Sequence, residues 1–186
     1  IMWANNETGN LFEVETLAEL AHEAGALFHT DAVQAVGKVP MDLKTSEIDM
    51  LSLSGHKFHA PKGIGALYVR RGVRLRPMIR GGHQERGRRA GTENAPAIIG
   101  LGVAAELART HLDDENTRVR ALRDRLEKGL LQRISHAMVT GDPEHRLPNT
   151  SNIAFEYIEG EGILLLLNKA GIAASSGSAC TSGSLE

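Results

Sequence analysis

The first half of the chain alternates between helical and strand-like hydrophobic patterns. Between Glu13 and Ala24, apolar residues recur at steps of three and four, which predicts a helix, and Gly25 follows as its terminating residue. Apolar runs rich in strand formers each end at a polar position, and they lie at 1–4, 26–30, 49–54 and 64–69. Strands that alternate with a helix in this order are typical of an α/β fold.

The second half carries longer helical patterns. A helix is expected after Asn94, which would cap it, with Pro96 in its first turn. Near Thr110 the sequence becomes highly charged, and apolar residues at steps of three and four predict an amphipathic helix over 113–136. Further elements are expected as strands at 138–140 and 151–156, a helix over 160–170 and a short strand over 172–174.

These patterns predict two domains. Residues 1–110 are expected to form part of a larger α/β domain with a mainly parallel sheet, and residues 111–186 to begin a smaller α+β domain. The smaller domain would end in a loop of glycines and small polar residues that carries Cys180.

Composition narrows the classes of partner. A net charge of -2 over 186 residues gives no general reason to expect nucleic acid or an anionic membrane surface. The single cysteine cannot form an internal disulfide, which fits a reducing compartment, and we expect a cytoplasmic protein. The longest apolar stretch, residues 162–167, is too short to span a bilayer.

Lys57 is the first candidate for chemistry. It follows the buried strand 49–54 after a glycine, and ligands of open α/β sheets bind beyond the carboxyl ends of strands. Partial burial there would favour the neutral, nucleophilic amine that forms a Schiff base. A solvated loop lysine is the alternative that the local sequence leaves open.

Polar residues follow the other predicted strands too. Asp31 could cap a helix that begins at Ala32, or its carboxylate could face a cationic ring nitrogen, and the spacing does not choose. Gln34 lies just beyond it. The polar turn Asn5–Gly9 offers side-chain amides at a strand end, although ordinary turn chemistry would also explain it.

Three further features have two readings each. The segment 70–89 is basic and glycine-rich and leads to Thr92, and it forms either a solvated loop or an anion-binding site at the start of a helix. It lacks the interleaved aromatic residues of a groove that binds single-stranded nucleic acid. His56 and His59 are spaced like metal ligands, but no further cluster supports a metal site. Cys180 is either an incidental surface cysteine or a nucleophile on a moving arm.

Taken together, five segments resemble the cysteine desulfurases, pyridoxal 5'-phosphate enzymes of the class V aminotransferase family. The resemblance covers residues 1–186. The long cysteine loop resembles the group that serves housekeeping or nitrogen-fixation iron–sulfur assembly, and the sequence as a whole is most similar to the nitrogen-fixation type. The resemblance rests on the segments Asn-Asn-Glu-Thr-Gly (5–9), His-Thr-Asp-Ala-Val-Gln (29–34), Ser-Gly-His-Lys (54–57), Arg-Ala-Gly-Thr (89–92) and Ser-Ser-Gly-Ser-Ala-Cys-Thr-Ser-Gly (175–183).

The resemblance implies an aspartate aminotransferase-like large domain and a role for each matching residue. Lys57 would hold the cofactor covalently and move protons, with His56 beside it in the catalytic group, and Asp31 would pair with the pyridinium nitrogen. The remaining cofactor contacts would come from the phosphate ligands Ser54 and His56, from Gln34 and Asn6 near the phenolic oxygen, and from Thr92 at the partner subunit's cofactor. A homodimer is therefore implied.

The resemblance also implies the reaction and its partners. Cys180 would take sulfur from L-cysteine as a persulfide, leaving L-alanine, and pass it to an iron–sulfur scaffold protein, with contact to a nascent cluster through the same sulfur. Complete family members are longer at both ends, so we expect a partial sequence that is inactive alone. A selenocysteine lyase, another aminotransferase-family enzyme and a non-enzymatic sulfur-relay module are the alternatives; an aminotransferase would not need Cys180.

Overall fold

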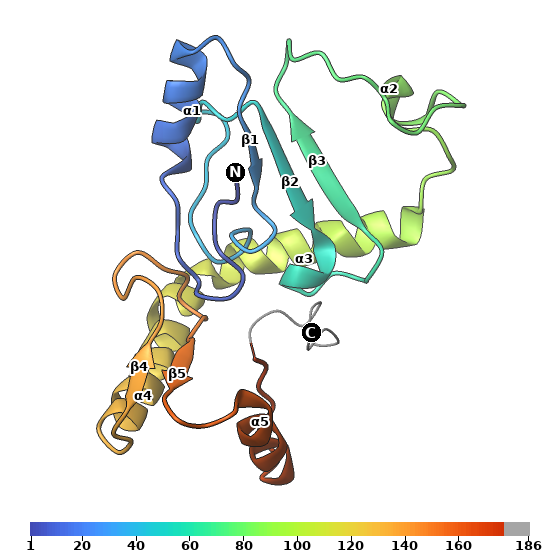
Figure 1. Cartoon of the computed structure of the whole chain (residues 1–186). Coiled ribbons are helices and arrows are strands. Elements are labelled where there is room, and N and C mark those ends of the chain that lie inside the picture. The colour runs from blue at the N-terminus through green and yellow to red at the C-terminus, as the bar shows by residue number, and fades with distance from the viewer. Residues whose placement is uncertain (177–186) are drawn as a thin grey trace. The chain divides into compact units, whose positions relative to one another are not determined.

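The computed structural model describes residues 1–176 (Figure 1). The chain folds into two compact units. The first comprises Ile1–Trp3 and Phe12–Asp113, and the second comprises Ala4–Leu11 together with the chain from Asp114 onward. Assignment of these units to the predicted large and small domains stays a prediction.

The first unit is built on a three-stranded sheet in the order β1-β2-β3 (Figure 1). The strands are β1 (His29–Asp31), β2 (Met50–Ser54) and β3 (Gly65–Val69). β1 and β2 run parallel and β2 and β3 antiparallel, and Met2 adds a parallel bridge to Asp31 on the other side of β1. The chain between β2 and β3 is too short for a crossover, which makes that pair antiparallel. The α/β class is confirmed.

Helix α1 (Val14–Glu23) forms where the hydrophobic pattern predicts it, and Gly25 ends it with a positive φ of 71°. Polar contacts hold this helix to the chain before β2. The carboxylate of Asp49 accepts hydrogen bonds from the His22 ring and the Phe28 amide, both at 2.8 Å. Burial alone would raise the pKa of Asp49, but these hydrogen bonds outweigh burial and lower it.

The segment after β1 forms consecutive turns rather than the expected helix. The amides of Ala35 and Val36 both donate to the Ala32 carbonyl, so the first turn is helix-like. Gly37 then adopts a left-handed φ of 77°, which a continuing helix does not permit. Ala32 and Ala35 are fully buried and fix the segment against the core.

Helix α3 (Ala95–Asp114) begins as predicted, because the Asn94 side chain accepts a hydrogen bond from the Ala97 amide. A short helix, α2 (Gln84–Gly87), precedes it. At its other end α3 continues through a π-helical turn, η2 (Glu115–Val119), into α4 (Arg120–Leu131). The change of composition near Thr110 is therefore not a break in the helix.

In the second unit, α4 contacts the first strand of a two-stranded antiparallel sheet made of β4 (Ala137–Val139) and β5 (Ile153–Phe155). Helix α5 (Gly160–Lys169) follows and ends at Gly171, with φ 75°. These elements agree with the prediction, but the strand expected over 172–174 is wrong. The Ile172 amide donates to the Leu167 carbonyl and thereby completes the helix C-cap, so this segment is used as a cap.

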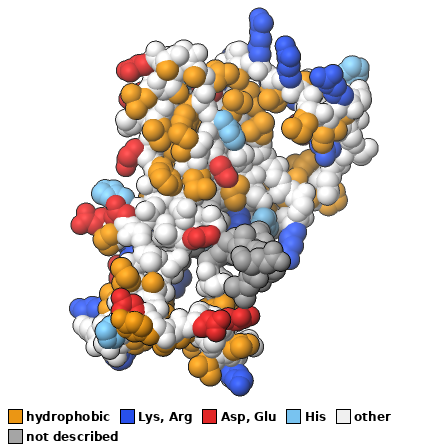
Figure 2. All heavy atoms as spheres, viewed as in Figure 1, with side chains coloured by type: hydrophobic (Ala, Val, Ile, Leu, Met, Phe, Trp, Pro, Cys, Tyr) orange, Lys and Arg blue, Asp and Glu red, His pale blue; other side chains and the backbone are white. Residues whose placement is uncertain are grey.

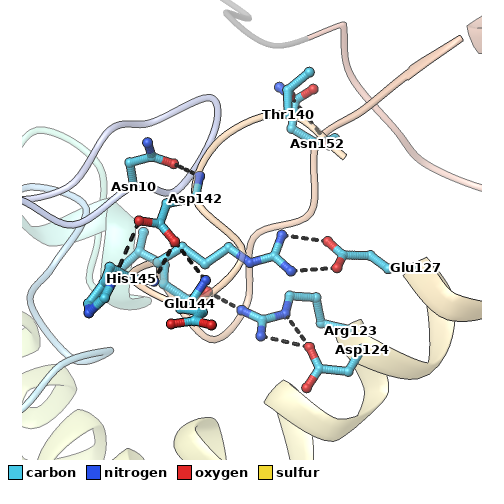
Figure 3. A network of polar contacts seen from close by, with 11 residues as sticks. Asn10, Arg123, Asp124, Glu127, Thr140, Asp142, Glu144, His145 and Asn152 are labelled. Atoms are coloured by element: carbon cyan, nitrogen blue, oxygen red, sulfur yellow. Dashed lines mark hydrogen bonds and ion pairs between the residues drawn. The ribbon is translucent and has the colours of Figure 1, made fainter. Parts of the chain in front are cut away.

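A polar network joins the loop 140–152 to α4 and to Asn10, the residue after the Asn5–Gly9 turn (Figure 3). The Arg146 guanidinium binds both carboxylate oxygens of Glu127, at 2.6 and 2.5 Å, and both side chains are buried. Arg123 donates to the Leu147 carbonyl at 2.6 Å. Burial alone would raise the pKa of Glu127, but hydrogen bonds and positive charge from Arg146 outweigh burial and lower it.

Many apolar side chains of the described chain remain exposed, as the orange atoms in Figure 2 show. On α3 they include Ile99, Val103 and Leu107, which are 68, 56 and 53% exposed and lie four residues apart on one face. None of the helices within residues 1–176 has the length and apolar character needed to cross a membrane.

Candidate functional site

Lys57 lies in a single turn of 3₁₀-helix, η1 (Gly55–Phe58), directly after the carboxyl end of β2 (Figure 1). Gly55 and Phe58 are buried, whereas His56 and Lys57 are exposed. The partial burial expected for Lys57 is therefore wrong for the described chain. In this turn the core-facing positions are taken by Gly55 and Phe58, so the two residues between them face outward.

Close packing fixes the η1 turn. A Cβ atom added at Gly55 would lie 2.9 Å from the Ala60 Cβ and 3.0 Å from the Ile64 carbonyl oxygen, so only glycine fits there. The Phe58 side chain packs in a small core with Ala60 and Ala104. His59 then caps the turn in the left-handed conformation, with φ 71°. The backbone around Lys57 is thus held by buried neighbours on both sides.

Ser54 and His56 form a pair beside Lys57. The Ser54 hydroxyl and the His56 Nδ1 are 2.8 Å apart, which is a hydrogen bond between the last residue of β2 and the second residue of η1. When the hydroxyl donates, Nδ1 accepts and the proton of a neutral ring lies on Nε2. The pair therefore offers an oriented imidazole next to the amine.

Asp31 lies at the carboxyl end of β1, opposite Ser52 of the parallel neighbour β2. Since parallel strands end at the same edge of a sheet, the Asp31 and Ser54 positions lie at one edge, and η1 leaves from it. The Asp31 Oδ1 accepts a hydrogen bond from the Val33 amide at 2.9 Å, so the carboxylate supports the first of the turns that follow β1. Gln34 lies in the following turn and is half-buried.

Thr92 is exposed and lies two residues before the Asn94 cap of α3. The loop 70–94 before that helix carries Thr92 and a group of exposed arginines, which include Arg71, Arg74, Arg76, Arg80, Arg86, Arg88 and Arg89. Figure 2 shows Lys and Arg side chains over this part of the first unit. The loop is therefore cationic and leads to a helix N-terminus, a combination that favours an anion.

Asn6 belongs to the second unit, whereas the other predicted cofactor contacts belong to the first. It lies in the Asn5–Gly9 turn, where the Asn5 side-chain oxygen accepts hydrogen bonds from the amides of Glu7 and Thr8. Asn6 itself is exposed, and no hydrogen bond of its side chain is seen within residues 1–176. Asn5 thus shapes the turn and leaves the Asn6 amide accessible.

Cys180 lies outside the described residues, so its predicted role stays a prediction. The described residues contain no group of three or more His, Cys, Asp or Glu side chains arranged to hold a metal ion. His56 and His59 are therefore not part of a group of three or more possible metal ligands within the described residues.

The donor set at this sheet edge fits pyridoxal 5'-phosphate. An exposed amine, a hydroxyl–imidazole pair and a carboxylate follow two adjacent parallel strands, and each matches one need of that cofactor: a covalent attachment point, polar contacts and a partner for the ring nitrogen.

The sequence analysis missed one further residue near Lys57. The ammonium of Lys38 donates to the Lys57 carbonyl at 3.3 Å. Nothing in its local sequence points to this contact, because 19 residues separate the two lysines.

The chain is similar over its whole length to known proteins of one kind. The family model described as aminotransferase class-V matches residues 1–186. A cysteine desulfurase of Gluconacetobacter diazotrophicus is 85% identical over all of this chain, and the cysteine desulfurase NifS of Azotobacter vinelandii is 74% identical. In both cases the match covers 46% of the relative, so the chain spans about half the length of these curated relatives.

Solved structures show the same likeness. A NifS-like protein of 42% identity matches 94% of this chain and 48% of its own, with a TM-score of 0.89. A NifS-like protein from Rickettsia africae, at 33% identity, matches 96% of this chain and 49% of its own, with a TM-score of 0.90.

Proposed function

The chain belongs to the class-V aminotransferase family, and from this premise we propose that the complete protein is a pyridoxal 5'-phosphate-dependent cysteine desulfurase. It would convert L-cysteine to L-alanine and hold the sulfur as a persulfide for iron–sulfur cluster assembly, including nitrogenase maturation. The observation that carries the proposal is the rigid Lys57 turn at the carboxyl end of β2, beside the Ser54–His56 pair and one parallel strand from Asp31. The high identity to proteins named cysteine desulfurase supports it.

Different residues of the first unit bind different parts of the cofactor. When bound, the cofactor supplies an electron sink for the bonds that break at the substrate. The Lys57 amine attaches it, and the Asp31 carboxylate keeps the ring nitrogen protonated. Ser54 and His56 hold the phosphate and its surroundings, and Gln34 donates its amide near the phenolic oxygen.

Two residues extend the site beyond this group. The exposed Asn6 amide would serve as a hydrogen-bond partner of the phenolic oxygen or of the adjacent substrate region. Thr92, on the cationic loop before α3, binds the phosphate held by a second copy of the chain, and this makes the active protein a homodimer. The same loop supplies positive charge where a phosphate needs it.

Cys180 carries the sulfur-transfer step. Its thiolate attacks the sulfur of bound L-cysteine, so an S–S bond forms as the substrate's C–S bond breaks. The electron pair of the broken bond stays with the substrate carbon, which takes up a proton and leaves as part of L-alanine, with Lys57 Nζ as the proton carrier. An iron–sulfur scaffold protein then accepts the sulfur from the persulfide.

The test uses the complete protein with L-cysteine, and measures alanine and persulfide together. We expect both in the unaltered protein, whereas Cys180→Ala should keep the bound cofactor and lose persulfide formation. Cys180→Ser serves as the matched control for side-chain size, and it should behave like the alanine variant. Undiminished sulfur transfer in Cys180→Ala would contradict the proposed role of this residue.

A further inference from the structure

Two turns follow the parallel strands β1 and β2, and they are connected to each other. The turn segment 32–39 carries Gln34, and η1 carries Lys57. At its start, the segment is fixed to β2, because the Ala32 amide donates to the Ser52 carbonyl at 2.9 Å. At its end, the Lys38 ammonium reaches η1 and donates to the carbonyl of Lys57.

The amides of the turn itself are not available to the Lys57 carbonyl, and its donor is a side chain. The last carbonyls of a helix have no partner within the helix, and the next amides along the chain would normally satisfy them. Here the Ala60 amide already donates to the Gly55 carbonyl at 3.0 Å, and Pro61 has no amide hydrogen. A cation is also favoured at a helix C-terminus, so the Lys38 ammonium suits the carbonyl it meets.

Close packing brings Lys38 to that position. Gly37, the preceding residue, has a φ of 77°, which glycine adopts without strain. A Cβ atom added to it would lie 3.0 Å from the Ala108 Cβ on α3 and 3.5 Å from the Phe58 Cβ on η1. The backbone at residue 37 therefore fits between the helix and the lysine-bearing turn, and residue 38 emerges beside that turn.

We propose that Lys38 is a positioning residue for Lys57. Its ammonium fixes the backbone of η1 relative to the turn that carries Gln34, and so sets the place from which the Lys57 amine extends. This inference rests on the proposed function. Because Lys38 acts on the backbone of the catalytic lysine and on no atom of the substrate, its loss should lower kcat and leave KM for L-cysteine nearly unchanged.

The experiment compares Lys38→Met, Lys38→Arg and Lys62→Met in the complete protein. Lys62 is an exposed lysine shortly after η1, with no hydrogen bond seen within residues 1–176, so it is the matched control for charge. One readout is hydrogen exchange of the cofactor-free protein over residues 55–60, and the other is the separate measurement of kcat and KM with L-cysteine. Methionine keeps the length of the side chain and removes its donor, whereas arginine restores a donor.

We expect Lys38→Met to speed exchange over residues 55–60 and to lower kcat by about two- to tenfold, the range expected for the loss of one hydrogen bond, with KM within about twofold. Lys38→Arg should recover most of both, and Lys62→Met should match the unaltered protein. Faster exchange without a change in kcat would reduce Lys38 to a structural contact and overturn the positioning role. Unchanged exchange and unchanged kcat would also overturn it.

The outcomes separate this inference from the proposed function. If the unaltered protein neither binds pyridoxal 5'-phosphate nor converts L-cysteine, the proposed function fails and the positioning role fails with it. If the unaltered protein is active and Lys38→Met is equally active, only the role of Lys38 fails.

Discussion

The turn that carries Lys57 and the turn that carries Asn6 are held in opposite ways. The Lys57 turn is shaped by apolar packing: Gly55 fits against Ala60 and Ile64, and Phe58 is buried against Ala104 of α3. The Asn6 turn is fastened by polar contacts to a loop far along the chain. The Lys57 turn is therefore held mainly by apolar packing, and the Asn6 turn by polar contacts to residues far along the chain.

The distant contacts of the Asn6 turn are specific. The Asn10 side chain accepts from the Asp142 amide at 2.8 Å, and the Leu147 amide donates to the Gly9 carbonyl at 2.9 Å. The loop that makes these contacts is in turn held to α4 by the Glu127–Arg146 pair. Changes on α4 should thus reach the Asn6 turn, whereas the Lys57 turn should respond mainly to its own neighbours.

Arg146→Met tests the distant anchor and should have the largest effect. Removing one partner of a buried ion pair leaves the Glu127 carboxylate buried without its partner, which costs about 3–5 kcal/mol. We expect a loss of that order in the free energy of unfolding, with faster hydrogen exchange over residues 4–12. The double variant Glu127→Leu, Arg146→Met should recover most of the stability, and a loss below about 1 kcal/mol in Arg146→Met would contradict the anchor.

Gly55→Ala tests the fit of Gly55 against Ala60 and Ile64, and we expect it to have the second-largest effect on stability. The added methyl group would overlap the Ala60 Cβ and the Ile64 carbonyl, so we expect a loss of about 1–3 kcal/mol by denaturant unfolding. The matched control is Gly102→Ala on α3, where an added Cβ meets nothing within 4 Å and should stabilise the helix by about 0.5–1 kcal/mol. Equal stability of the Gly55 and Gly102 variants would show that the local fit is unimportant.

Acid should sharpen the contrast between the turns. The pKa of Glu127 is lowered by Arg146 despite burial, and the amides of His145 and Glu144 lower the pKa of Asp142. A lowered folded-state pKa stabilises the fold above the unfolded-state pKa, and this contribution is lost as the pH falls through the folded-state value.

The expected window therefore opens below the ordinary values of 4.5 for Glu127 and 3.8 for Asp142. Hydrogen exchange, corrected for its intrinsic pH dependence, should show residues 4–12 losing protection there before residues 55–60. The cluster around Phe58 consists of apolar side chains, whose packing does not depend on a protonation state. Loss of protection in the reverse order would contradict the proposed difference between the turns.

The smallest effect is expected from Arg118→Met. Arg118 and Asp114 form an exposed pair one helical turn apart, and such pairs contribute little to stability because solvent screens them. Thermal unfolding should hardly change, and the exchange of residues 4–12 should match the unaltered protein. A loss as large as that of Arg146→Met would mean that any charge change near α4 disturbs the loop.

The sequence predicted the elements whose causes are local. Helix α1 with Gly25, the Asn94 cap and the strand that leads to Lys57 all follow from periodicity and turn residues. The helix that the sequence allowed after Asp31 is a series of turns instead, and Gly37 ends it in the left-handed conformation beside Ala108. The strand expected at 172–174 was wrong because Ile172 caps α5.

Long-range contacts account for what the sequence could not predict. The assignment of Ala4–Leu11 to the second unit depends on hydrogen bonds such as that of Asn10 to Asp142, which are 132 residues apart. The contact of Lys38 with the Lys57 carbonyl also joins residues that are apart in the sequence, here by 19 positions. Lys57 is exposed because the opposite side of η1 faces the core. A turn of four residues is too short to show a hydrophobic periodicity, so the sequence does not predict which of its sides is buried.

The most direct test of the proposed function is the absorbance spectrum of the complete protein, with Lys57→Ala and the control Lys62→Ala beside it. We expect a yellow cofactor band that borohydride bleaches in the unaltered protein and in Lys62→Ala, and no such band in Lys57→Ala. A folded, cofactor-supplied protein without the band, or an unchanged band in Lys57→Ala, would contradict the claim that Lys57 holds pyridoxal 5'-phosphate.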